Sequence, residues 1–439
     1  MTATLVLVLV IALAYLATHV LYDWVAKRYK IVSGAEYLVL GYLLGPQVSG
    51  IFDAQVLQGF APLTTLTLGW VGVLVGMQFH LPRLIKVPGQ AWRIAFGEAL
   101  LTLSLVAGVM TWLFSAFYAL PTRVALGPGL ALGAIAASVT PAGVQAVAAL
   151  MRSKGAVLHQ LEIATNVNNL VAISAFGLLL CFLRPPVFAT FRTPTVTEWA
   201  VIAVGIGIVG GALFHLFLGN EKNPDRLVIS VAGAVILASG TAAYLQLSPI
   251  LSAMIVGFIL VNTSRNRERV EHVVKQAERP LYFVLLVFAG AMWQPPVQPV
   301  WFIPVLVFLG WRAMSKIGAA RLVTRWNGAM PMLGPHWGRA LMGQGALAIA
   351  LSLDYVQHAQ PRFGFVVFSA AALSVLLTEF AALRLVSSVT EPLLEPLMRI
   401  PIAGRYLRDE LRTAEELADA EASSAGAGPQ RPPGDGGVA

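Results

Sequence analysis

Charged residues and cysteine are scarce in this chain of 439 residues. Asp, Glu, Lys and Arg make up 12% of it, roughly half the share found in a typical soluble domain. The single cysteine, Cys181, cannot form an internal disulfide and is expected to be a packing residue. The histidines, His358 among them, are isolated, and no nucleophile–base set is present. We therefore expect neither an enzyme nor a cofactor or metal site.

Long apolar runs separated by short polar loops fill most of the chain, and 57% of its residues are hydrophobic. This pattern is typical of an all-α polytopic membrane protein in a lipid bilayer. We predict about 13 transmembrane helices in residues 1–400, followed by a short charged helix and a disordered cytoplasmic tail in residues 401–439. The predicted spans are roughly 3–22, 34–51, 61–80, 93–118, 125–151, 157–183, 197–219, 226–244, 248–263, 280–294, 298–321, 338–356 and 363–389.

Lys and Arg are concentrated in the loops that follow odd-numbered spans, with five in residues 262–280. Basic loops stay on the cytoplasmic side of a membrane. The N-terminus is therefore predicted to lie outside and the C-terminus in the cytoplasm. The net charge of +8 comes from these loops, so it concerns membrane orientation and does not predict a nucleic-acid partner.

Polar residues interrupt two consecutive apolar spans near their middles. Pro141 removes a backbone donor and should break the helix of residues 125–151 close to Ser138 and Thr140. The next span carries three amides at a similar depth, and buried amides must face protein or a water-filled cavity. A broken helix beside polar groups is typical of the binding site of a secondary transporter. The three amides are Asn166, Asn168 and Asn169.

An ordered series of short matches relates the two halves of the chain. Gly41 and Gly257 are 216 residues apart, and Gly76 and Gly290 are 214 apart. The break at Thr140 has a counterpart around Gln344, which lies between two glycines. A nearly constant offset across an odd number of spans predicts two inverted repeats with two broken, crossing helices. The substrate site is then expected where the two breaks meet, with Gln344 among its residues.

Ionisable residues within predicted spans are candidates for function. Lys316 and Arg312 lie one turn apart, and we expect a buried structural or coupling role for Lys316. For Arg312, such a buried role and extension of the side chain to the cytoplasmic membrane interface are equally well supported by the sequence. Glu379 is deep enough for a proton site, although a structural pair with Arg384 also accounts for it. An interfacial or capping role is the more typical one for four other acids, namely Glu36, Glu98, Glu162 and Asp354.

These motifs together resemble the monovalent cation:proton antiporter superfamily, which includes Kef-type potassium efflux proteins and NapA-type sodium/proton antiporters. The resemblance covers about residues 1–390. It is carried by the stretches SGAEYLVLGYLLGP (33–46), SVTPAGVQ (138–145), NVNNLVAI (166–173), LSPILSAMIVGFILVN (247–262), KIGAARL (316–322) and MGQGALAIALSL (342–353). It implies a homodimer in a bacterial inner membrane that exchanges Na⁺ or K⁺ for H⁺ by alternating access.

One departure from the family pattern bears on the chemistry. The pair that carries the titrating aspartate in the family is Asn168-Asn169 in this chain, and an amide cannot release a proton near neutral pH. Three hypotheses follow: an exchanger in which another acid such as Glu379 or Glu98 supplies the proton, a proton-uncoupled transporter or channel-like protein, and a membrane sensor of the same fold.

The predicted orientation can be tested with a cysteine at position 270, in the basic loop, in a Cys181→Ser background. A thiol reagent that cannot cross membranes should leave this cysteine unmodified in intact cells and label it after the membrane is permeabilised. Ready labelling in intact cells would overturn the orientation.

The departure at Asn168-Asn169 predicts weak or absent cation/proton exchange at the usual position. Asn169→Asp should move the protein towards proton-coupled exchange, because a carboxylate beside Lys316 can hold either a proton or a cation. The measurement is cation-dependent dequenching of a pH-sensitive dye in everted vesicles. Robust exchange by the unmodified protein would show that another acid carries the proton.

Overall fold

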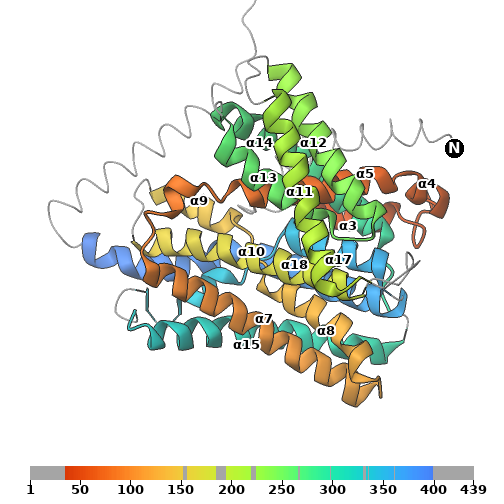
Figure 1. Cartoon of the computed structure of the whole chain (residues 1–439). Helices are drawn as coiled ribbons and strands as arrows, with labels where there is room; N and C mark the ends of the chain where they lie inside the picture. The colour runs from red at the N-terminus through yellow and green to blue at the C-terminus, as the bar shows by residue number, and fades with distance from the viewer. Residues whose placement is uncertain are drawn as a thin grey trace, which may run out of the picture.

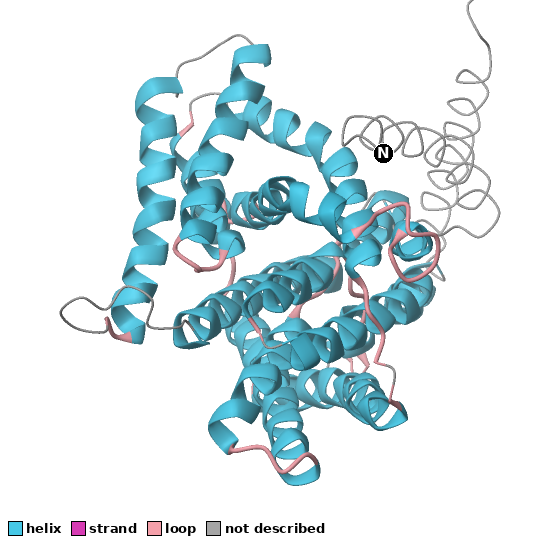
Figure 2. Cartoon of the chain, turned by 90° about the vertical axis from the view of Figure 1, so that its right-hand side faces the viewer, coloured by secondary structure: helices cyan, strands magenta, loops and turns pink. Residues whose placement is uncertain are grey.

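The computed structural model describes residues 35–151, 156–183, 194–218, 224–264, 267–296, 298–329, 333–334, 336–359 and 361–398. All regular structure within these residues is helical, as Figure 2 shows. The first predicted span (3–22) and the tail (401–439) lie outside the described residues. The domain boundary near residue 400 therefore stays a prediction.

Each predicted span from the second to the thirteenth coincides with one or two described helices. Six described helices are long and apolar enough to cross a membrane, and three shorter ones are also apolar. The helices that surround and support the site are α3 (Ala35–Leu44), α5 (Ala61–Met77), α7 (Gly89–Phe117), α8 (Thr122–Ala137), α9 (Ala142–Met151), α10 (Ala156–Leu183), α11 (Val196–Leu218), α12 (Pro224–Tyr244), α13 (Pro249–Thr263), α14 (Arg267–Met292), α15 (Phe302–Trp326), η3 (Trp337–Leu341), α17 (Ala346–His358) and α18 (Pro361–Met398).

The helices form two groups, which Figure 1 shows one above the other. We call α3, α5, α11, α12, α13 and α14 the glycine-packed bundle, in which α5 lies along α13 and α3 along α14. We call α7, α8, α9, α10, α15, η3, α17 and α18 the broken-helix bundle, in which α7 lies between α8 and α15. The two bundles meet where α10 and α17 approach α5, α13 and α14.

Glycines allow the helix backbones of the first bundle to touch. A side chain added at any of five positions would overlap a backbone carbonyl group of the facing helix. Close approach of this kind is how membrane helices gain packing energy when lipid offers no hydrophobic driving force between them. The contacts are Gly41 with Val287, Gly290 with Leu38, Gly72 with Ile250, Gly76 with Met254, and Gly257 with Val73.

Both broken helices are present in the second bundle. Helix α8 ends at Ala137 and α9 begins at Ala142, because Pro141 cannot donate a hydrogen bond and pushes the preceding residue towards an extended conformation. The second break separates η3 from α17. The amide of Thr140 donates to the carbonyl oxygen of Gly343 at 2.9 Å, so the two interruptions lie against each other.

Gly76→Ala should destabilise the protein by about 1–3 kcal/mol, because the added methyl group forces α5 away from α13. The matched control is Gly108→Ala in α7, where nothing lies within 4 Å of the added carbon, so stability should be unchanged or slightly higher. Thermal unfolding in detergent checks both variants. Equal melting temperatures for the two would contradict the assigned helix contact.

Candidate functional site

A buried acid lies at the centre of the site. Glu98, in the third turn of α7, has no exposed surface. Its Oε2 accepts a hydrogen bond from Asn168 Nδ2 at 2.6 Å, and its Oε1 accepts one from Thr102 Oγ1 at 2.9 Å. The interfacial position expected for Glu98 is therefore wrong. The sequence pattern placed it near the start of a span, but α7 already begins at Gly89 and carries Glu98 deeper among its neighbours.

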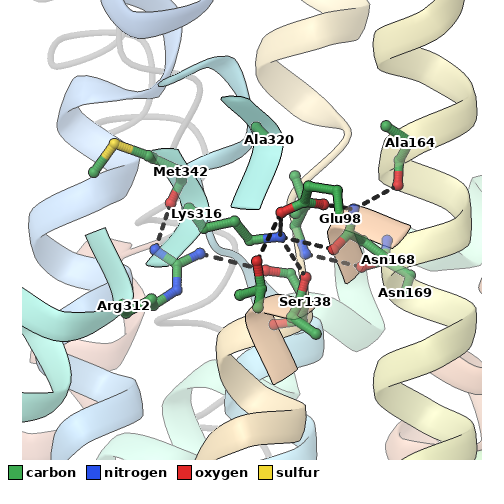
Figure 3. Close-up of polar contacts among 12 residues, drawn as sticks. Glu98, Ser138, Ala164, Asn168, Asn169, Arg312, Lys316, Ala320 and Met342 are labelled. Atoms are coloured by element: carbon green, nitrogen blue, oxygen red, sulfur yellow. Dashed lines mark hydrogen bonds and ion pairs between the residues drawn. The ribbon is translucent and has the colours of Figure 1, made fainter. Parts of the chain in front are cut away.

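The principal partner of Glu98 is Lys316 of α15, which also has no exposed surface. Its Nζ lies 3.2 Å from Glu98 Oε1 and donates to Asn168 Oδ1 at 2.7 Å (Figure 3). It donates further to the carbonyl oxygen of Ala137 at 3.1 Å. Ala137 is the last residue of α8, where a cation also offsets the negative end of the helix dipole. Lys316 is thus buried, as the sequence predicted, with a carboxylate and a helix end as its partners.

Arg312 lies one turn before Lys316 and is 2% exposed. Its Nη1 donates to the carbonyl oxygen of Met342 at 2.8 Å, and its Nη2 reaches that of Ser138 at 3.4 Å. Each carbonyl belongs to one of the two helix breaks, where the backbone has lost its helical partners. Arg312 therefore links the two breaks and does not extend to the membrane interface.

The two adjacent amides of α10 hold different parts of the site together. Asn168 contacts both members of the Glu98–Lys316 pair and is fully buried. The Oδ1 of Asn169 accepts a hydrogen bond from the amide of Val139 at 2.9 Å, which ties α10 to the first break. Asn169 is 2% exposed. Both side chains point into the cluster in Figure 3.

The second break is held by Gln344, which is fully buried. Its Nε2 donates to the carbonyl oxygen of Ile135 and approaches Ser138 Oγ at 3.4 Å. Its Oε1 accepts from Ser374 Oγ of α18. The side chain of Thr140 is partly buried, and its Oγ1 lies 3.0 Å from the point that a Cβ at Gly345 would occupy. Ser138, Thr140 and Gln344 are thus brought together at the crossing.

Of the other predicted site residues, Asn166 is described and lies outside this cluster. Asn166 is only partly buried and takes part in none of the contacts above. Glu379 lies on α18, but its side chain is outside the described residues, as are those of Arg384 and Glu36. The side chain of Glu162 is partly exposed, and its Oε2 lies 3.9 Å from His159 Nδ1. This exposure agrees with the interfacial role expected for Glu162.

Several site residues were missed from the sequence. Thr102 could have been found, because it lies four residues after Glu98 and therefore on the same helix face. Tyr282 of α14 gave no such signal, although its hydroxyl group accepts a hydrogen bond from the amide of Ala346 at 2.7 Å. Ser374 and Thr378 of α18 both bind Gln344, and only the tertiary structure brings them to it.

The cluster joins one carboxylate, two cations, amides and hydroxyl groups without exposure to bulk water. A buried carboxylate is stable only with a compensating positive charge and hydrogen bonds. Lys316 supplies that charge beside Glu98 and Asn168. Carboxylate, amide and hydroxyl oxygens are ligands for hard cations such as Na⁺ and K⁺. The described residues include no group of three or more His, Cys, Asp or Glu that could hold a metal ion.

Comparison with known proteins places the chain in a family. The family model for the sodium/hydrogen exchanger transmembrane domain matches residues 3–384. The chain is 22% identical over 348 residues to a protein of Alkalihalophilus pseudofirmus named as an ammonium/H⁺ antiporter subunit, AmhT, and the match covers 78% of this chain and 86% of the relative.

Solved structures have the same fold. The sodium proton antiporter MjNhaP1 of Methanocaldococcus jannaschii at pH 8 superimposes with a TM-score of 0.63 and 18% identity, covering 88% of this chain and 99% of the other. An electron-microscopy structure of the same antiporter gives a TM-score of 0.59 at 18% identity, covering 89% and 98%. The resemblance drawn from the motifs is confirmed, and this chain belongs to the sodium/hydrogen exchanger transmembrane family as a multi-pass secondary transporter and not an enzyme.

Proposed function

We propose that this protein exchanges a monovalent cation for protons by alternating access, and that Glu98 binds the proton. The observation that carries the proposal is the buried Glu98–Lys316 pair, with 3.2 Å between Glu98 Oε1 and Lys316 Nζ. Among the described side chains, Glu98 is the carboxylate that reaches Asn168. It therefore supplies the negative charge that Asn168-Asn169 lack. Of the hypotheses that the sequence left open, this placement favours the exchanger with an acid on another helix.

The proposed exchange follows from competition for one carboxylate. Glu98 is neutralised by Lys316, by a proton or by the transported cation, and a low-dielectric site holds few uncompensated charges. A cation that binds Glu98 must displace the ammonium group of Lys316, and a proton that binds Glu98 must expel the cation. Binding of the two transported ions is then mutually exclusive, which is the requirement for exchange.

The cation ligands are proposed to be oxygens of the crossing. Asn168 Oδ1 now accepts from Lys316, and Asn169 Oδ1 accepts from the amide of Val139. Movement of Lys316 would free Asn168 Oδ1 for a cation, next to Glu98 and near Ser138. Na⁺, K⁺ and NH₄⁺ all fit this chemistry, since each is bound by carboxylate and amide oxygens. The relatives are named for sodium and for ammonium, so all three cations belong in the assay.

Inverted repeats and alternating access are proposed together, and the glycine contacts support them. The contact of Gly41 with Val287 corresponds to that of Gly257 with Val73, and the contact of Gly290 with Leu38 corresponds to that of Gly76 with Met254. Equivalent members of these pairs are separated by 214 or 216 residues, the offsets of the repeat. A closely packed glycine bundle would act as the fixed part, against which the broken-helix bundle moves.

The remaining proposals concern the membrane setting. We place the protein in a bacterial inner membrane as a homodimer, with its N-terminus outside and its C-terminus in the cytoplasm. Val270 is buried against the glycine-packed bundle, so a cysteine there would react slowly from either side. Glu268 is exposed, and Glu268→Cys is the better reporter for labelling. The relative AmhT is named as a subunit, so co-purification with a partner chain is worth testing.

The test of the proposed function is Glu98→Gln in everted vesicles or proteoliposomes with a pH-sensitive dye. The unmodified protein should show cation-dependent dequenching with at least one of Na⁺, K⁺ and NH₄⁺, and the variant should fall to the signal of empty vesicles. The variant also leaves Lys316 buried without its counter-charge, which costs about 3–5 kcal/mol. Size-exclusion profiles therefore accompany the transport assay.

A second-site variant separates lost chemistry from lost folding. Asn168→Asp in the Glu98→Gln background places a carboxylate where Lys316 already binds, at 2.7 Å, and should restore part of the exchange. Glu162→Gln is the matched control, because Glu162 is a partly exposed acid outside the cluster, and it should exchange normally. Loss of exchange in Glu379→Gln, with exchange intact in Glu98→Gln, would instead assign the proton to Glu379. Cation flux without any pH dependence would favour a proton-uncoupled transporter or channel.

A further inference from the structure

A second buried acid lies where the two bundles meet, on a different part of α17 from the crossing. Asp354 has no exposed surface. Its Oδ2 accepts a hydrogen bond from Ser248 Oγ at 3.1 Å, and Ser248 is the N-cap residue of α13. Because α17 belongs to the broken-helix bundle and α13 to the glycine-packed bundle, this bond joins the two. The interfacial role expected for Asp354 is therefore wrong, since the side chain is buried between helices.

The neighbour of Asp354 one turn later is His358. Its Nδ1 lies 2.8 Å from the carbonyl oxygen of Asp354 and 3.4 Å from the carboxylate Oδ1. A carbonyl oxygen only accepts hydrogen bonds, so Nδ1 must carry the hydrogen. The neutral ring therefore has Nε2 available to take up a proton. The side chain of His358 is 16% exposed, which gives it contact with the solvent that Asp354 lacks.

Asp354 and His358 can share one proton, which Asp354 Oδ1 is free to accept. Oδ1 of Asp354 has no hydrogen-bond partner in the described structure, although the neighbouring Oδ2 has Ser248. With one proton shared between the carboxylate and the imidazole, the pair has no net charge. Without that proton a lone negative charge remains between packed helices, and burial of an unpaired charge is unfavourable. Loss of the proton therefore favours separation of α13 from α17 and entry of water.

Among the described residues, His358 is the charged group that forms an ion pair with Asp354. The elements packed on α17 are α5, α8, α10, α14 and α18, and α13 adds Ser248. Helices α5 and α13 contain no titratable side chain. Tyr282 of α14 binds the opposite end of α17. Arg123 of α8 and Arg362 of α18 are exposed. The charged residues of α10 (His159 and Glu162) and of α14 (Arg267 to Arg279) lie in the first half of each helix.

Helix α17 connects this pair to the crossing. It begins at Ala346, directly after the second break, where Gly345 lies against Thr140 of the first break. Asp354 follows eight residues after Ala346, which is about 12 Å along a helix axis. The two ends of α17 thus bind the other bundle separately, through Tyr282 at the start and through Ser248 near the end. Separation at Ser248 would free the far end of the helix that carries the second break.

We propose that Asp354 and His358 form a second proton-binding site, which holds α17 against Ser248 of α13 while the proton is bound and releases it when the proton leaves. The site is separate from Glu98 and binds its proton at the boundary of the two bundles. The proton enters through His358, the partly exposed member, and is shared with Asp354 through Nδ1.

Hydrogen–deuterium exchange of the full chain in nanodiscs tests the proposal without a transport assay. Peptides covering residues 245–251 and 352–358 are followed between pH 6 and pH 9 after correction for the intrinsic exchange rate. In the closed state α17 is held against Ser248, and in the open state the two are separated. The closed state binds one proton more than the open state. Exchange should therefore accelerate by about tenfold for each pH unit above the point where the pair loses its proton. The same dependence of the exchange rate on pH should persist in Glu98→Gln, whatever the overall rate of that less stable variant, which separates it from the proposed transport site.

The variants make the test decisive. Asp354→Asn should remain closed at every pH, because no charge is left to bury. Ser248→Ala should exchange rapidly even at pH 6, whereas the matched control Ser252→Ala should keep the response, since Ser252 binds Ala203 within the glycine-packed bundle. His358→Gln covers the case that Asp354→Asn does not fold, and it should shift the pH at which exchange accelerates. A pH response in Asp354→Asn or His358→Gln identical to that of the unmodified protein would overturn the proposal.

Discussion

Two interrupted helices leave backbone carbonyl groups in the middle of a membrane protein, and the rest of the site depends on satisfying them. An unpaired carbonyl in an apolar environment costs several kcal/mol. The two breaks partly satisfy each other through Thr140 and Gly343. The carbonyls of Ala137, Ser138 and Met342 receive donors from Lys316 and Arg312 instead. Two positive charges on one helix, one turn apart, thus supply donors to the crossing.

Two buried cations create the next requirement, which is a negative charge. Glu98 meets it from α7 and is oriented by Thr102 and Asn168. Lys316 thus has a carboxylate partner on α7, although the residues facing it from α10 are amides. It also links the charge of one carboxylate to the backbone at the crossing, because Lys316 binds Glu98 and Ala137 with the same ammonium group. Glu98 and the end of α8 at the first break thus share one donor group.

The glycine-packed bundle has a contrasting construction. Its helices touch through backbone at Gly41, Gly76, Gly257 and Gly290, which leaves little room for sliding. Between the two bundles the described polar contacts are few and made by single side chains. They include Tyr282 with Ala346, Trp293 with Ser369, and Ser248 with Asp354. Backbone contact within one bundle, and apolar packing with only a few polar contacts at its boundary, are compatible with a fixed part and a moving part.

Local sequence determined much of this protein. Apolar runs and Pro141 were enough to predict spans and a broken helix, because membrane helices obey strict rules of length and backbone pairing. Lys316 and Asn168 were identified as site residues because a polar or charged side chain within a membrane span is costly and usually serves a function. Only the tertiary structure decided which acid pairs with Lys316 and what Asp354 contacts. Glu98 lies 70 residues from Asn168 and 218 from Lys316, and Asp354 lies 106 from Ser248. No local pattern encodes such pairings, since the partner of a buried charge is set by the way the helices pack.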